Sequence, residues 1–194
     1  MNNKNKRELL LKILRQNIEE GMGEKEREES PVSSYSVLQG DKVIKFAEQF
    51  IKDKGRFVYC ENEKDFINKL QSLIQYRKWE NILSFSENLH LYLKHIGVET
   101  TLHNPNAIVG ISLCHAMIAN VGSFMVTSQQ GIGSNVNKLP SIFIIVAHTS
   151  QIYSNYKEAL QPLLNNLPSH ITTLKSSEAL SQSVVEFYLY LIDE

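Results

Sequence analysis

Cysteine and tryptophan are scarce in this sequence, neither charge sign is in clear excess, and long apolar runs are absent. The 194 residues include two cysteines, Cys60 and Cys114, both among apolar neighbours. Two buried reduced thiols are therefore a simpler interpretation than a disulfide. Because an iron–sulfur cluster normally takes four thiolate ligands, any such cluster must belong to a partner protein.

The balanced charge and the lack of apolar runs exclude two further classes. With 20 basic and 21 acidic side chains the net charge is −1, so the chain has no broad basic field for nucleic acid. A bilayer-spanning helix needs roughly 18 consecutive apolar residues, and no run approaches that length. The amino-terminal residues lack the apolar core of a secretory signal, so we expect a cytoplasmic protein.

Metal-ligand spacings are also missing. None of the six histidines is placed three or four positions from a second ligand on a convincing helix face, so we expect no metal site. Of the six, His148 is the most interesting because it directly follows the most apolar segment. Carboxylates are few beyond residue 104, which equips that half poorly for acid–base chemistry.

Apolar periodicity divides the chain at about residue 36. Residues 6–20 have the pattern of an amphipathic helix, and a charged segment without periodicity follows at 24–31, so residues 1–36 are interpreted as a helical arm and linker. Residues 37–194 form the predicted domain. Its first half alternates helical and extended patterns: helices at 43–51, 62–74 and 86–96, and strands at 56–60, 81–85 and 98–102.

The charge-poor second half is predicted to supply inner strands at 107–111, 122–127, 141–147 and 184–192. Residues 141–147 are almost continuously apolar, as in a strand buried on both faces. Residues 114–119 are interpreted as a helix-tolerant turn, and 156–164 as a helix. Alternating helices and strands imply an α/β fold with a mainly parallel sheet flanked by helices in three layers.

Polar residues gather where the segment 109–127 breaks. Ser112 and His115 share one short turn, but a serine nucleophile elbow needs glycine two residues on either side, and here only Gly110 is present. A helix-capping Ser112 and an ordinary His115 are thus favoured. Gly131 and Gly133 resemble the start of a dinucleotide fingerprint without its third glycine. A flexible loop at a strand end, bordering any ligand crevice, is the preferred interpretation.

The chain resembles the LUD domain, the lactate-utilisation family of proteins related in fold to sugar-phosphate isomerases and CoA-transferases. The strongest local match is Gly-Ile-Ser at 110–112, followed by Ala116, Ile118, Ala119, Gly122 and Ser123. The similarity continues through Leu-Pro at 139–140, the apolar segment 141–147 and the exit at 148–153. The resemblance implies an isomerase/CoA-transferase-like α/β fold and a cleft at the strand ends.

Three polar features of the family differ here. Asn120 stands where the family usually has glutamate, and the family's arginine before Leu-Pro corresponds to a position near Ser134. Residues 174–184 are too few to hold the family's Gly-Pro-Ser, Thr-Ala-Asp-Ile-Glu and His-Gly-Pro segments. We therefore expect this chain to share the family's fold more fully than its binding site.

Three hypotheses of function follow from the resemblance. The first is an accessory component of lactate utilisation beside iron–sulfur partners, its cleft binding a small anionic metabolite or nothing. The second is an enzyme or binding protein for a small carboxylated or phosphorylated ligand, and the third a degenerate relative that docks partners through its amino-terminal helix. No catalytic residue is assigned. The candidate ligand-binding residues are Gly110, Ser112, His115, Asn120, Gly122, Ser123, Gly131, Gly133 and Ser134.

Overall fold

Side chains of the central strands are almost all buried and alternate between two cores, because each strand presents one set of side chains to each face of a sheet. On β7 (Ile142–His148), Phe143 and Ile145 belong to one core, whereas Ile144 and Val146 belong to another. The computed structural model describes residue 8 and residues 42–132 and 139–193. The predicted arm and linker at 1–36 lie, apart from Glu8, outside the described residues, as do Gly133 and Ser134.

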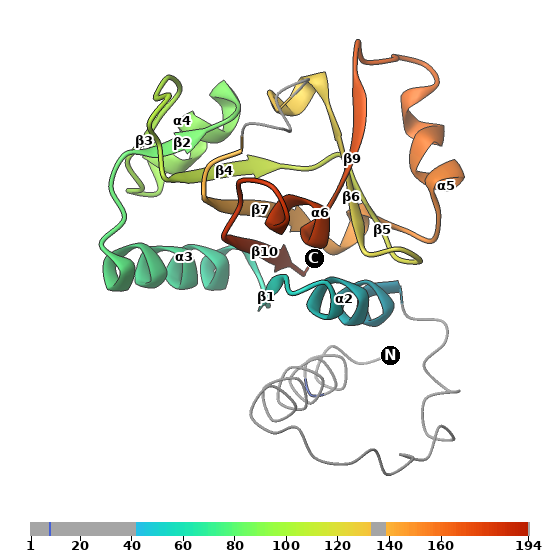
Figure 1. The fold of residues 1–194 in the computed structure, drawn as a ribbon, viewed down its shortest axis with the longest axis horizontal. Helices are drawn as coiled ribbons and strands as arrows, with labels where there is room; N and C mark the ends of the chain where they lie inside the picture. Colours follow the sequence, from blue (N-terminus) through green and yellow to red (C-terminus); the bar gives the residue numbers. More distant parts are fainter. Residues whose placement is uncertain (1–7, 9–41, 133–138, 194) are drawn as a thin grey trace.

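The central sheet has six strands, all paired in parallel (Figure 1). The expectation of an α/β fold with a mainly parallel sheet is confirmed. In spatial order its strands are β1 (Arg56–Cys60), β10 (Glu186–Ile192), β7, β4 (Val109–Leu113), β2 (Ile82–Ser84) and β3 (Thr100–Thr101). The most apolar segment is thus a central strand, as its sequence predicts.

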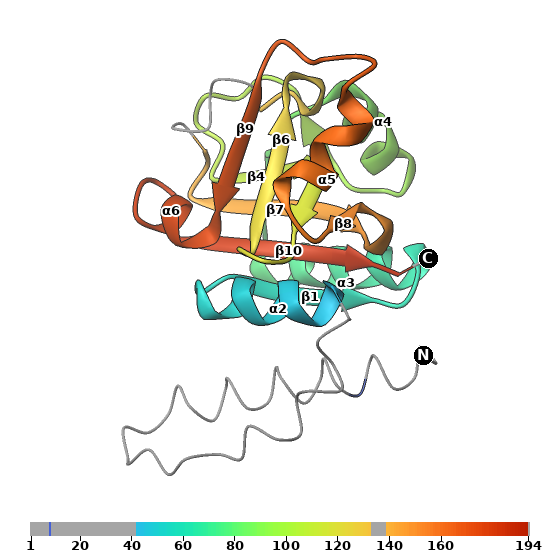
Figure 2. The ribbon, with the colours of Figure 1, turned by 90° about the vertical axis from the view of Figure 1, so that its right-hand side faces the viewer.

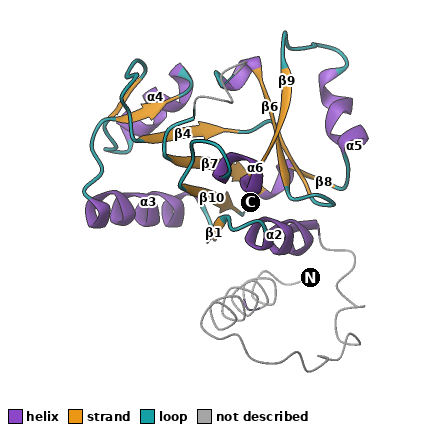
Figure 3. Ribbon diagram, in the orientation of Figure 1, coloured by secondary structure: helices purple, strands orange, loops and turns teal. Residues whose placement is uncertain are grey.

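Two helices cover one face of this sheet. Both α3 (Glu63–Arg77) and α4 (Glu87–His95) begin at the caps that the sequence indicates: Asn62 accepts from the Asp65 amide at 3.0 Å, and Ser86 accepts from the Leu89 amide at 3.3 Å. Their apolar sides pack on alternate residues of β4, β7 and β10. Figure 3 shows this helical layer beside the strands.

The opposite face carries α2 (Lys42–Lys52), α6 (Ser176–Leu180) and a second sheet. The second sheet comprises β8 (Ile152–Tyr153), β5 (Ala116–Ile118), β6 (Ser123–Thr127) and β9 (Ile171–Lys175), in that order. Figure 2 shows β6 and β9 running across β7 and β10. On the outer side of this sheet lies α5 (Tyr156–Leu160), followed by a 3-10 turn (Gln161–Leu163). Two other 3-10 turns follow β6 and β7, at Ser128–Gln130 and Thr149–Gln151.

Two predictions for the second half are wrong in detail. Residues 114–119 do not form a helix-tolerant turn, because Ala116–Ile118 is the strand β5. Residues 122–127 do form a strand, β6, but it pairs antiparallel with β5 and β9 in the second sheet and not within the parallel one. Short runs buried on all sides carry no periodicity that separates helix from strand or one sheet from another.

Candidate functional site

Gly110 and Gly131 both approach Phe85, the residue after β2, and Ser112 lies on the same strand as Gly110. A Cβ on Gly110 would lie 2.8 Å from the Phe85 ring, and one on Gly131 would lie 1.6 Å from the Phe85 carbonyl oxygen. Ser112 is fully buried, and its hydroxyl donates to the Leu113 carbonyl at 3.0 Å, with the Gln130 carbonyl oxygen a more distant alternative acceptor at 3.5 Å. Gly110 and Ser112 are therefore packed in the interior, whereas Gly131 is exposed but lies tightly against the Phe85 backbone.

Asn120, Gly122 and Ser123 form a second group at the turn between β5 and β6. The Lys45 ammonium donates to the Asn120 side-chain oxygen at 2.8 Å, and the buried Ser123 hydroxyl lies 2.9 Å from the Tyr156 hydroxyl. Gly122 has φ +61°, and a Cβ there would lie 2.7 Å from Gln49 Cβ. This turn is thus packed between α2 and α5, on a different sheet from the first group.

His115 lies at the bend where the chain leaves the parallel sheet for the second one. Its backbone N–H donates to the Met125 carbonyl at 2.8 Å, and its ring Nε2 lies 3.3 Å from the Ala159 carbonyl oxygen. The carboxamide of Gln151 donates to the preceding carbonyl, that of Cys114, at 2.8 Å. These contacts join β6 to α5 through His115, which gives this residue a structural role.

A cavity of about 220 Å³ opens at the carboxyl ends of β4, β7 and β10. Ligands of open α/β sheets bind at this edge. The last residue of each strand reaches it, and the first turns of α3 and α4 flank it. Its lining residues are Glu63, Phe66, Asn88, Leu89, Tyr92, Leu113, Val146, His148 and Ile192. Of these, the sequence singles out His148 alone, through its position after the central strand.

The polar rim of this carboxyl-edge cavity is ordered by hydrogen bonds. The Tyr92 hydroxyl donates to the Glu63 carboxylate at 2.7 Å. Burial, together with that carboxylate, raises the pKa of Tyr92, so the phenol stays protonated and remains a donor. The amino ends of α3 and α4 point their backbone N–H groups toward this edge, which favours negative charge there, although Glu63 opposes it.

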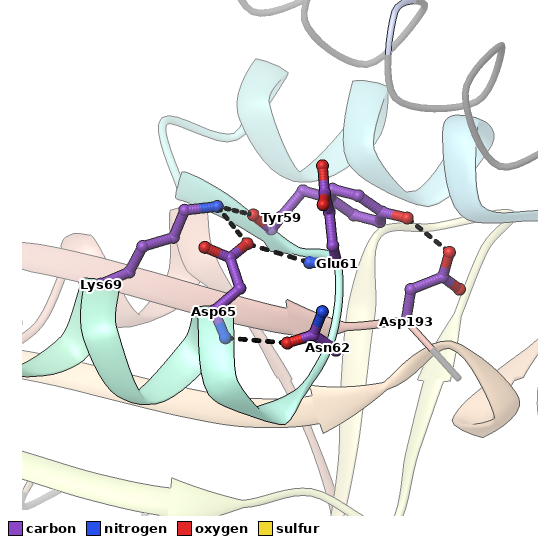
Figure 4. A network of polar contacts seen from close by, with 6 residues as sticks. All are labelled: Tyr59, Glu61, Asn62, Asp65, Lys69 and Asp193. Carbon is purple, nitrogen blue, oxygen red and sulfur yellow. Dashed lines mark hydrogen bonds and ion pairs between the residues drawn. The ribbon is translucent and has the colours of Figure 1, made fainter.

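A polar network stiffens the same edge of the sheet beside the cavity (Figure 4). The Tyr59 hydroxyl and the Thr149 hydroxyl both donate to the largely buried Asp193 carboxylate, the second at 3.0 Å. Lys69 links the network to α3, because its ammonium donates to the Tyr59 carbonyl at 2.7 Å and pairs with Asp65 at 2.6 Å. The ends of β1, β10 and α3 are therefore held in one arrangement.

Neither cysteine is equipped to react or to bind a metal. Cys60 and Cys114 lie in different cores, on opposite faces of the parallel sheet. Burial raises the pKa of each thiol to about 12, so both stay protonated at neutral pH. Across residues 42–132 and 139–193, no group of three or more histidine, cysteine, aspartate or glutamate side chains could hold a metal ion.

Comparison with known proteins supports the resemblance seen in the sequence. A family model described as the LUD domain matches residues 43–180, from α2 to the end of α6. The chain belongs to the LUD domain family. At family level it is therefore a lactate-utilisation-related protein. In this LUD domain the strand β10 lies beyond the matched residues, yet it pairs with both β1 and β7.

One solved structure shares the fold of this LUD domain. It is a crystal structure of a DUF162 family protein from Deinococcus radiodurans, with a TM-score of 0.59 and 11% sequence identity. The alignment covers 78% of this chain and 96% of that one. No curated protein matches the chain. In the part of this LUD domain that the structure describes, no helix is long and apolar enough to cross a membrane.

Asn120 places a neutral oxygen beside a lysine in this LUD domain. A glutamate at this position would form an ion pair with the ammonium of Lys45, whereas Asn120 offers it a neutral oxygen. The neighbouring Lys42 pairs instead with Glu158 at 3.4 Å. The turn between β5 and β6 thus keeps a lysine whose charge Asn120 does not neutralise.

Proposed function

We propose that this LUD domain protein is an accessory component of lactate utilisation, acting beside iron–sulfur partner subunits that oxidise lactate to pyruvate. The proposal is carried by the two cysteines, which lie on opposite faces of one sheet with their thiol pKa values raised to about 12. Two separated thiols cannot replace the four thiolates that a cluster normally takes. Under this proposal the two electrons released by lactate oxidation pass to a cluster held by a partner.

The test is purification of the tagged full-length chain at its native expression level from its own cells grown on lactate. We expect co-purification of a protein with cysteine-rich cluster motifs, together with iron and acid-labile sulfide, and a yield of pyruvate from added lactate. A chain lacking residues 1–30 is expected to lose the partner, if the amino-terminal arm is the docking element. Purification that returns the chain without any iron–sulfur protein would refute the accessory role.

The carboxyl-edge cavity favours a second function, the binding of a small carboxylate. Its volume of about 220 Å³ is about seven times that of a water molecule in the liquid, so a three-carbon acid fits inside whereas CoA or a dinucleotide extends beyond it. Leu89, Leu113 and Val146 offer an apolar wall to the carbon skeleton. The helix amino ends and the His148 imidazole would face the carboxylate.

Calorimetric titration with lactate, pyruvate, CoA and nucleotides tests this second function. We expect saturable binding of lactate or pyruvate that weakens about tenfold or more in His148→Gln, because one polar contact to the ligand is lost. The matched variant is Asn120→Ala, which probes the turn between β5 and β6. Loss of binding in the Asn120 variant alone would move the site to that turn, and heat changes for none of the compounds would eliminate a small-carboxylate role.

A further inference from the structure

A second cavity, of about 480 Å³, lies at the opposite edge of the parallel sheet, where β2 and β3 begin. Its walls come from the last turns of α3 and from the loops that precede the two strands. The residues that carry chemistry are Gln71 and Gln75 of α3, Trp79, Glu80 and Asn81 before β2, and Glu99 before β3. We call it the amino-edge cavity.

The walls of the amino-edge cavity are held in place before any ligand arrives. The Gln71 carboxamide donates to the Ile96 carbonyl at 2.6 Å, which ties α3 to the end of α4. The Trp79 ring packs edge-on against Tyr188, with 6.0 Å between ring centroids. Lys78 ends α3 in a left-handed conformation with φ +53°, and this sharp turn sends the chain back toward Trp79. A preorganised wall loses little entropy on binding.

The electrostatics of this cavity favour a cation. Both α3 and α4 end at this edge, and the carboxyl end of a helix carries a partial negative charge. The charged residues in its lining are Glu80 and Glu99, both exposed. The nearby Lys78 and Lys94 do not line it, and Arg77 is engaged by Glu186. Each helix therefore has its amino end at the carboxyl-edge cavity and its carboxyl end at the amino-edge cavity. Of the two cavities, the amino-edge cavity is the one that is also lined by two carboxylates.

We propose that the amino-edge cavity binds a guanidinium group carried on an aliphatic stem. Trp79 provides an aromatic wall that attracts such a cation. The chain's own Arg77 guanidinium lies 5.6 Å from the Trp79 ring centroid, and its charge is balanced by Glu186, so the ligand would approach the ring from the cavity side. The side-chain oxygens of Gln75 and Asn81 and the carboxylates of Glu80 and Glu99 accept the hydrogen bonds that a planar guanidinium donates. The group comes from a free guanidinium metabolite or from an arginine of a partner protein.

Trp79 is the sole tryptophan of the chain, so intrinsic fluorescence reports on this cavity directly. The full-length protein is titrated with agmatine, a free guanidinium compound, and with N-acetylarginine N-methylamide, which mimics an arginine within a chain. We expect a saturable change in Trp79 emission with at least one of them. Saturation by agmatine alone assigns the cavity to a free metabolite, and saturation by the blocked arginine assigns it to a partner side chain.

Neutral and charge-matched controls make this test decisive. The citrulline analogue of the blocked arginine has the same shape without the charge and is expected to bind at least about tenfold more weakly. Glu80→Gln and Glu99→Gln are each expected to weaken binding about two- to fivefold, as loss of an exposed charge pair does. Glu87→Gln, at the other end of α4, removes the same charge and should leave binding unchanged. Equal binding of the citrulline analogue, or no saturable change with either cation, overturns the proposal.

Discussion

At the scale of single residues, substitutions at Gly131 and Gly97 distinguish the cost of backbone strain from the cost of steric overlap. Both have positive φ values, +75° and +78°, which L side chains rarely adopt. A Cβ at position 131 would overlap the Phe85 carbonyl oxygen, whereas one at position 97 would meet nothing closer than 3.6 Å. We therefore expect Gly97→Ala to lower the free energy of unfolding by about 1 kcal/mol, and Gly131→Ala by about 3 kcal/mol or more.

Urea unfolding of the two variants, followed by circular dichroism, measures this difference. Both substitutions add one methyl group and impose a similar backbone penalty, so the gap between them reports the overlap with Phe85. Equal losses of stability would mean that the loop after β6 shifts away from β2 at little cost. In that case the packing around Ser112 would be more adaptable than the close approach of Gly131 to Phe85 indicates.

Phe124 joins several elements, and its removal is a test at the scale of the strand β6. The ring centroid lies 5.3 Å from that of Phe46, 5.4 Å from that of Phe50 and 5.4 Å from that of Phe187. These contacts fasten the second sheet to α2 and to the central strand β10. Phe124→Ala is expected to lower the free energy of unfolding by about 3–5 kcal/mol, the usual cost of emptying a core phenylalanine site.

Denaturant unfolding monitored at the single Trp79 and by circular dichroism tests the role of β6. Coincident transitions are expected, because the second sheet and the parallel sheet share one core. The control is Tyr76→Ala, at a ring that is 83% exposed, which should change stability by less than about 0.5 kcal/mol. Two separate transitions in the wild-type protein would show that the sheets unfold independently.

Glu186 links three elements and gives the whole molecule a dependence on pH. Its carboxylate, at the start of β10, contacts Arg56 of β1 at 3.2 Å and also Arg77 of α3, and it accepts from the Tyr188 hydroxyl at 2.6 Å. Burial alone would raise the pKa of Glu186, but the hydrogen bonds from Tyr188 and Arg77 and the two arginine charges outweigh it. The net pKa lies below the ordinary value of 4.5.

A depressed folded-state pKa means that Glu186 stabilises the fold fully above pH 4.5 and loses this contribution as pH falls toward the folded-state value. We expect Glu186→Gln to cost about 1–3 kcal/mol near neutral pH, because two arginines lose an ionic partner. Its loss of stability on acidification should also be shallower than that of the wild type. Urea midpoints of the variant and the wild type, measured at about pH 7 and at about pH 3.5, report both the loss of stability at neutral pH and its change on acidification. Glu87→Gln, at an exposed position, should retain the wild-type slope, and a Glu186 variant with that same slope would contradict the linkage.

Local pattern determined much of this molecule by itself. The caps Asn62 and Ser86 and the apolar stripes of α2, α3 and α4 are read from neighbouring residues, because a helix closes its hydrogen bonds within a few positions. The same holds for the central position of β7, whose apolar run is typical of a strand covered on both faces. The resemblance to the LUD domain likewise depends on residues close together in sequence.

Tertiary structure alone decided how the second half is divided and where the cavities lie. Residues 116–118 form a strand because they pair with β6 and with β8, and β8 lies more than thirty residues further along the chain. The partners of Asn120 and Ser123, namely Lys45 and Tyr156, are likewise remote in sequence. Strand pairing joins segments at any separation, and a cavity is the space that several such segments leave between them. A pattern read along the chain carries no measure of that space.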